Sequence, residues 1–210
     1  MKSKKREKID KMKEKITMAA VKVYAEKGMQ GIKITDIAKE ANISYGLVYH
    51  YFKNKEDIMN EIFSRSINIF LEAIEKVSYK DEPLEAKLRG FTNFLFNACR
   101  EMPEFMHVIM YEVIWTPRFL ETRNFISFTM AFTIFEKMLS SCKRNGEISR
   151  DTDVTVATYM FFGGLEMLLT GIILKAIPIN KQEIFDRISD RFITQYIRGI
   201  MVKEGIKNGI

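Results

Sequence analysis

Apolar residues recur along this chain at the three- and four-residue spacing of amphipathic helices, and no segment shows the alternation that marks a half-buried strand. The first segment places Ile9, Ile16, Ala20 and Tyr24 on one face and ends at Gly28, a residue suited to a left-handed helix end. Proline, glycine and asparagine separate the later segments. The pattern predicts an all-α protein of about nine helices.

Two short helices are predicted directly after this first one. Thr35 can cap a helix over residues 36–41, and Asn42 can take the left-handed conformation that ends it. Ser44 can then cap a second helix over residues 45–51. Two helices joined by so short a turn are typical of a helix-turn-helix, whose second helix enters the major groove of DNA.

Longer helices are predicted in the rest of the chain. Asn54 can cap a helix over residues 55–77, which would connect an N-terminal DNA-binding domain of residues 1–54 with a body of residues 55–210. Acids in its first turn suit the helix dipole. The remaining helices are expected at residues 83–102, 103–114, 117–144, 152–176 and 181–204.

The net charge of +6 is confined to the start of the chain. Residues 1–60 hold 14 Lys and Arg against 8 Asp and Glu, so they carry the entire excess and leave the body neutral. A basic segment beside a neutral body is typical of a module that binds a polyanion. A solvated tail is the alternative, since Lys2, Lys4, Lys5 and Arg6 stand together at the start.

The two short helices each have an apolar face that can pack inward and a second face that points outward. The apolar positions that can pack against the first helix are Ile37, Ala38, Ile43, Val48 and Phe52. The outward positions of the second helix that can reach DNA are Ser44, Tyr45, Gly46, Tyr49 and His50. The sequence therefore predicts a recognition helix over residues 45–51.

The motif Ile-Ala-x-x-Ala-x-Ile-Ser at residues 37–44, followed by Tyr-x-Tyr-Phe-x-Asn-Lys-Glu-Asp at residues 49–57, resembles the head of the tetracycline-repressor (TetR) family. The resemblance spans residues 8–63 and implies a transcription factor that binds operator DNA, by default as a repressor, with activation as the alternative. It implies phosphate contacts from Lys33, Thr35, Tyr49 and Lys55. It implies that base edges or the adjoining backbone are faced by Tyr45, Gly46, Leu47 and His50. Asn42 stands where the family prefers Gly, and Leu47 where it often has Thr.

The last two predicted helices carry apolar stripes that need a partner. In the TetR family the corresponding helices pair with their copies in a four-helix bundle, which implies a homodimer matched to a palindromic operator. Gly163 and Gly164 weaken a helix, so we expect a close helix approach there. The residues expected at the dimer interface are Phe161, Leu165, Leu168, Ile172, Phe185, Ile188, Phe192 and Tyr196.

The body is rich in Phe and Met, which either fill an ordinary core or line a pocket for a small apolar effector. The residues expected to contact such a ligand are Phe94, Asn97, Phe105, His107, Met110, Tyr111, Trp115, Phe128, Phe132, Phe162, Glu166 and Thr170. Residues 51–57 also resemble family members that regulate fatty-acid degradation in response to acyl-coenzyme A. An acyl chain, another apolar ligand and a drug-like cation paired with Glu166 all stay open.

Other classes of protein lack support in the sequence. Residues 154–174 approach the length of a membrane span, but Glu166 lies in the middle, two adjacent glycines precede it and no second span accompanies it, which favours a helix buried in the protein or dimer. Cys99 and Cys142 stand apart, and the chain begins with charged residues, so we expect a cytoplasmic protein with no disulfide, metal or cofactor.

No nucleophile-base motif or phosphate-binding glycine loop indicates an enzyme. Two rival functions stay open: a DNA-binding protein without an effector, and a carrier or enzyme with a vestigial helix-turn-helix.

Overall fold

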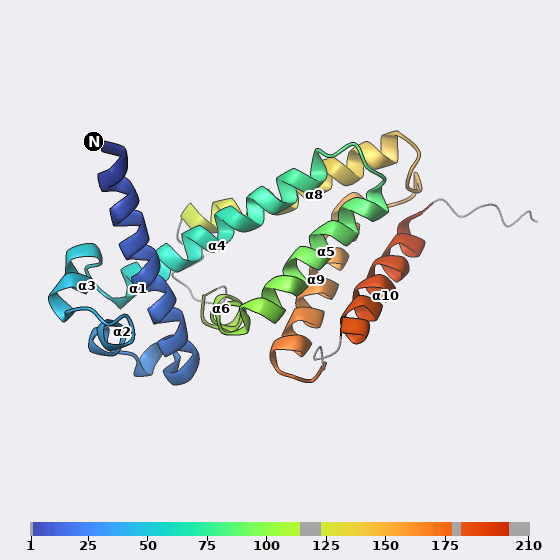
Figure 1. The fold of residues 1–210 in the computed structure, drawn as a ribbon. Coiled ribbons are helices and arrows are strands. Elements are labelled where there is room, and N and C mark those ends of the chain that lie inside the picture. Colours follow the sequence, from blue (N-terminus) through green and yellow to red (C-terminus); the bar gives the residue numbers. More distant parts are fainter. Residues whose placement is uncertain (1, 114–122, 178–181, 202–210) are drawn as a thin grey trace, which may run out of the picture. The chain divides into compact units, whose positions relative to one another are not determined.

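The computed structural model describes residues 2–113, 123–177 and 182–201, and these contain helices and no strand (Figure 1). The prediction of an all-α protein is confirmed. The helices are α1 (Lys2–Gly31), α2 (Ile34–Glu40), α3 (Tyr45–Tyr51), α4 (Lys55–Ser78), α5 (Leu84–Glu101), α6 (Pro103–His107), the π-helical segment η1 (Val108–Val113), α8 (Arg123–Arg144), α9 (Val154–Ile173) and α10 (Gln182–Ile200).

Packing divides the chain into two compact units, and α4 contributes to both. Unit 1 comprises Met1–Asn68 and Met102–Phe125, and unit 2 comprises Ile69–Glu101 and Ile126–Ile210. The helix-turn-helix therefore belongs to unit 1 together with α6 and η1. The functional boundary expected at residue 54 stays a prediction.

Unit 1 is organised around the middle of α1. Ile16 and Ala20 of α1, Ile37 of α2 and Val48 of α3 are fully buried, so three helices share one apolar core. The helical backbone of α1 breaks at Gly28, where φ is 66° and ψ is 168°. Only glycine takes this conformation without steric cost, and it lets the chain turn into α2.

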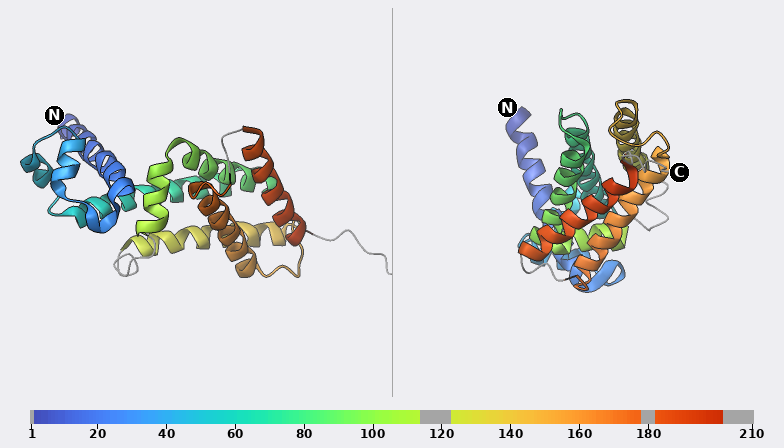
Figure 2. Two further views of the ribbon diagram at one scale, coloured as in Figure 1. Left: turned by 90° about the horizontal axis from the view of Figure 1, so that it is seen from below. Right: turned by 90° about the vertical axis from the view of Figure 1, so that its right-hand side faces the viewer.

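Unit 2 contains α5, α8, α9 and α10, all of which can be followed in Figure 2. Phe91, Phe135 and Phe161 are fully buried in its core. A Cβ atom at Gly164 would lie 2.9 Å from the ring of Phe192, so the predicted close approach at this glycine is confirmed. Gly163 meets nothing within 4 Å.

The apolar helix α9 is long and hydrophobic enough to cross a membrane, with a mean hydropathy of 1.6, yet only one side of it is buried in unit 2. A single helix of this kind is equally typical of a protein core. Asp153 caps it, because its Oδ1 accepts a hydrogen bond of 3.0 Å from the Val156 amide.

Candidate DNA-binding site and effector region

The turn between α2 and α3 has the geometry expected from its residues. Asn42 takes the left-handed conformation with φ at 49°, and Ser44 Oγ accepts a hydrogen bond of 3.3 Å from the Leu47 amide. Both predicted caps are confirmed. The predicted cap at Thr35 is wrong: α2 begins at Ile34, and its cap residue is Lys33, whose amide donates to Asp36 Oδ2 at 3.1 Å.

The outward side of α3 presents two tyrosines and an open backbone. Tyr45 and Tyr49 remain 50% and 44% exposed, and their ring centroids lie 4.7 Å apart in a T-shaped pair. A hydrogen bond with Tyr45 raises the pKa of Tyr49 above its ordinary value. A Cβ atom at Gly46 would meet nothing within 4 Å, which leaves this surface open to close approach.

Three of the four residues expected to hold phosphates lie at the starts of helices, and the fourth, Tyr49, lies in the second half of α3. Lys33 and Thr35 are exposed at the beginning of α2, and half-buried Lys55 is the first residue of α4. Asn54 Oδ1 accepts a hydrogen bond of 2.8 Å from the Asp57 amide, which confirms Asn54 as the cap of α4. The Tyr24 hydroxyl donates to the Lys55 carbonyl at 3.1 Å and ties α4 to α1.

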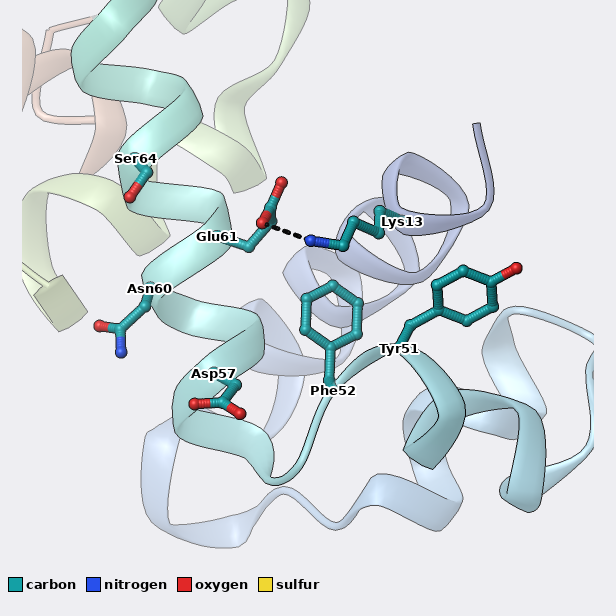
Figure 3. A pocket seen from close by; sticks show the side chains of 7 residues that line it. All are labelled: Lys13, Tyr51, Phe52, Asp57, Asn60, Glu61 and Ser64. Carbon is teal, nitrogen blue, oxygen red and sulfur yellow. Dashed lines mark hydrogen bonds and ion pairs between the residues drawn. The ribbon is translucent and has the colours of Figure 1, made fainter. Parts of the chain in front are cut away.

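A second tie between α1 and α4 lies beside the end of α3 (Figure 3). Lys13 Nζ lies 3.1 Å from Glu61 Oε2 and 5.5 Å from the centre of the Phe52 ring, and Arg65 Nε donates to Glu61 Oε1 at 2.8 Å. Burial raises the pKa of Glu61, but the bonds from Arg65 and Lys13 outweigh it and hold this pKa below its ordinary value. These contacts border an open recess of about 290 Å³.

Comparison with known proteins places these features in a family. Residues 16–62 match the model of the N-terminal domain of bacterial regulatory proteins of the tetR family. The fatty acid metabolism regulator protein of Bacillus subtilis is 30% identical over 154 residues, which cover 72% of this chain and 78% of that protein. The chain belongs to the TetR family. It is a DNA-binding transcriptional regulator whose helix-turn-helix is formed by α2 and α3.

Solved structures agree with this assignment over nearly the whole chain. The transcriptional regulator FadR from Bacillus subtilis, in complex with stearoyl-CoA, is 25% identical to this chain and superposes with a TM-score of 0.76. The matched region covers 89% of this chain and 98% of the FadR chain. The fatty acid degradation regulator FadR from Bacillus halodurans superposes with a TM-score of 0.77 at 22% identity. The matched region covers 93% of this chain and 96% of that one. The body of this TetR-family chain therefore shares their fold.

The predicted contact residues of this TetR-family chain are not equivalent in the structure. Tyr45, Gly46, Tyr49 and His50 are exposed on α3, whereas Leu47 is half-buried. Ser44 is exposed, but its hydroxyl already accepts the capping bond. We therefore treat Ser44 first as the residue that orders α3, and its contact to DNA stays a prediction.

An aromatic cluster dominates the core of unit 2, and Phe162 is at its centre. The Phe162 ring contacts Phe132 at a centroid distance of 4.6 Å, Phe135 at 5.0 Å and Phe91 at 6.2 Å. Phe132 and Phe162 are half-buried, so the cluster is accessible along this side. The structure thus brings together two of the predicted ligand residues, and Phe94 joins them by stacking on Phe91.

Other predicted ligand residues are placed differently. Asn97 and Thr170 are half-buried in unit 2, whereas Phe105, His107 and Met110 belong to unit 1. Glu166 is exposed on α9 in the single chain, and its place in a ligand pocket stays a prediction. The side chains of Tyr111 and Phe128, and the whole of Trp115, lie outside the described residues.

The predicted dimer stripe needs a correction. Five of its residues are buried within one chain and cannot face a second subunit: Phe161, Leu165, Ile172, Phe185 and Tyr196. Tyr196 is also held inside, since its hydroxyl donates to the Ala157 carbonyl at 2.9 Å. Leu168, Ile188 and Phe192 are half-buried. Only these three keep surface that a partner could cover.

The opposite side of α9 carries a different apolar stripe, which sequence reasoning missed. Its side chains are 54–68% exposed: Val156, Tyr159, Met160, Met167 and Leu174. Their spacing of three, four and seven residues puts them on one face of the helix, together with the open Gly163. Because α9 is apolar on both sides, its sequence gives no signal that tells the inner face from the outer one.

Proposed function

We propose that this regulator is a homodimeric repressor that acts in the cytoplasm and leaves its operator when a long-chain acyl ligand binds in unit 2. The observation that carries the effector proposal is the cluster around Phe162, taken with the acyl-CoA complex of a structural neighbour. A ligand releases DNA only if it binds the DNA-free conformation better than the DNA-bound one.

For the operator, we propose that α3 enters the major groove with Tyr45, Gly46, Leu47 and His50 toward the bases or adjoining backbone. The exposure of Tyr45 and the open space at Gly46 support this assignment. Phosphate contacts are assigned to the exposed Lys33 and Thr35, to Tyr49 and to Lys55. Their location at the ends of α2, α3 and α4 suits contacts that position the protein on the duplex.

For the effector, we propose an acyl chain against Phe132 and Phe162, with Phe94 at the margin of the same cluster. Each methylene that leaves water stabilises the complex by about 0.8 kcal/mol, so a chain of many carbons can bind tightly without a charged partner. Support also comes from the B. subtilis relative, which is named a fatty acid metabolism regulator. The exposed position of Glu166 gives no support to a cationic ligand paired with this carboxylate.

For the dimer, we propose that the outer stripe of α9, defined by Val156, Tyr159, Met160, Met167 and Leu174, packs against its copy. Half-buried Ile188 and Phe192 of α10 would border this seam. Gly163 lies in the stripe with open space around it, which permits close approach of a second helix. A two-fold dimer would place two α3 helices on the two halves of a palindromic operator.

Thermal unfolding with stearoyl-CoA tests the effector proposal. A ligand that binds only the folded protein at a hundredfold excess over its Kd adds about 2.7 kcal/mol of stability. We expect stearoyl-CoA to raise the melting temperature and free coenzyme A to leave it nearly unchanged, since only the acyl chain reaches the aromatic cluster. An equal shift with both ligands, or with neither, would contradict the acyl-chain assignment. The latter result would favour a regulator without this effector.

A further inference from the structure

The first turns of α1 form a strongly basic and exposed surface. Residues 4–11 are all exposed, and residues 4–8, which we call the basic turns, contain Lys4, Lys5, Arg6 and Lys8 against the single acid Glu7. Glu7 is itself paired with Lys11 at 2.9 Å. Among the side chains that the structure describes, none of the ion pairs includes a cation of the basic turns.

The cations of the basic turns are placed where they destabilise α1. The N-terminal end of a helix carries a partial positive charge, so cations there destabilise it by a few tenths of a kcal/mol each. No acidic residue occupies the first turn of α1 to offset this effect. Neither packing nor local electrostatics therefore accounts for the basic turns, whereas a polyanion would interact favourably with both the cations and the dipole.

The basic turns lie next to the DNA-binding surface within unit 1. Lys13 lines the recess that Tyr51 and Phe52 share at the C-terminal end of α3, so this point of α1 is beside the recognition helix (Figure 3). Lys4 lies nine residues earlier on the same helix, which at 1.5 Å per residue is about 14 Å farther along its axis. Figure 1 shows these turns projecting past α3. That length matches the roughly 12 Å width of a major groove, beyond which the next phosphate backbone lies.

We propose that the basic turns bind DNA phosphates that flank the groove occupied by α3. This inference rests on the proposed docking of α3 and adds a second contact surface to it. The partner is DNA rather than an anionic membrane, because an interfacial membrane helix needs a broad apolar face and residues 4–8 contain no apolar side chain. The contact is made to phosphates, so it increases affinity for any sequence and does not select bases.

The test is the triple variant Lys4→Gln, Lys5→Gln and Arg6→Gln, measured by fluorescence anisotropy on a random-sequence duplex of about 30 base pairs, three turns of B-DNA. The matched control, Lys137→Gln with Arg144→Gln and Arg150→Gln, removes the same charge from exposed positions of unit 2. Because each phosphate contact contributes about 0.9 to the slope of log affinity against log salt, the triple variant should lose up to about three units per bound subunit and bind at least about tenfold more weakly at low salt. The control should keep the wild-type slope.

The substitutions relieve repulsion at the helix end, so folding should be intact, and circular dichroism with a melting curve verifies this. A triple variant with the wild-type slope would overturn the inference and leave the proposed docking of α3 standing. Failure of the wild type to bind any duplex would overturn both. Loss of binding to phosphatidylglycerol vesicles, with DNA binding unchanged, would assign the basic turns to a membrane instead.

Discussion

The dimer interface proposed on α9 predicts that Met160→Glu strongly weakens the dimer. Met160 is 63% exposed in the single chain, and because full burial of a Met side chain is worth about 1.5–3 kcal/mol, its contribution to the seam is about 1–2 kcal/mol per subunit. A dimer contains this residue twice. The two buried carboxylates would add a penalty of at least about 3 kcal/mol. Together these terms weaken the dimer by more than about a thousandfold.

Sedimentation velocity over a wide range of protein concentration measures this change directly. The matched control is Met130→Glu, because Met130 is an exposed methionine of α8 that lies outside the stripe. We expect monomers from Met160→Glu and wild-type dimers from Met130→Glu, with similar melting temperatures for the separated chains. A wild-type dimer in the Met160→Glu variant would refute the assignment of the seam to this face of α9.

Three further predictions concern unit 1. Lys55→Ala should weaken binding similarly on operator and random duplexes and reduce the salt slope by about one unit per bound subunit, as anisotropy titrations would show. Ser44→Ala removes the hydroxyl that accepts the Leu47 amide and should cost about 1 kcal/mol of unfolding free energy in urea. The pKa of Glu61 is lowered in the folded chain, so its contribution to stability is present above its unfolded pKa and is lost as the pH falls through the folded one. Glu61→Gln should remove this acid-dependent loss, and urea midpoints measured below about pH 5 would detect it.

The helix-turn-helix was largely predictable because its signals are local. Asn42, Ser44 and Asn54 each act on a backbone within three residues, so the sequence places these caps correctly. Thr35 fails for a local reason as well: Asp36 bonds the Lys33 amide, and α2 begins earlier. The hydrogen bond between the Lys33 amide and the Asp36 side chain therefore sets the start of α2.

The body was less predictable because its assignments depend on tertiary packing. Phe161 and Met160 are adjacent in an apolar helix, yet one is fully buried and the other is mostly exposed. Hydrophobicity alone cannot assign them to opposite faces. Phe70 of α4 likewise joins the aromatic cluster, because its ring contacts Phe91 at a centroid distance of 5.5 Å. The apolar spacing along α4 does not predict this contact.

In the proposed function, an acyl ligand in unit 2 releases the DNA held by α3. Its most direct test uses a duplex enriched from a random library by the purified protein, with anisotropy recorded during titration of stearoyl-CoA. We predict that stearoyl-CoA releases the duplex and that coenzyme A alone does not. A duplex that stays bound at stearoyl-CoA concentrations that saturate the thermal shift would show that the acyl ligand binds without controlling DNA, and it would contradict the proposed release mechanism.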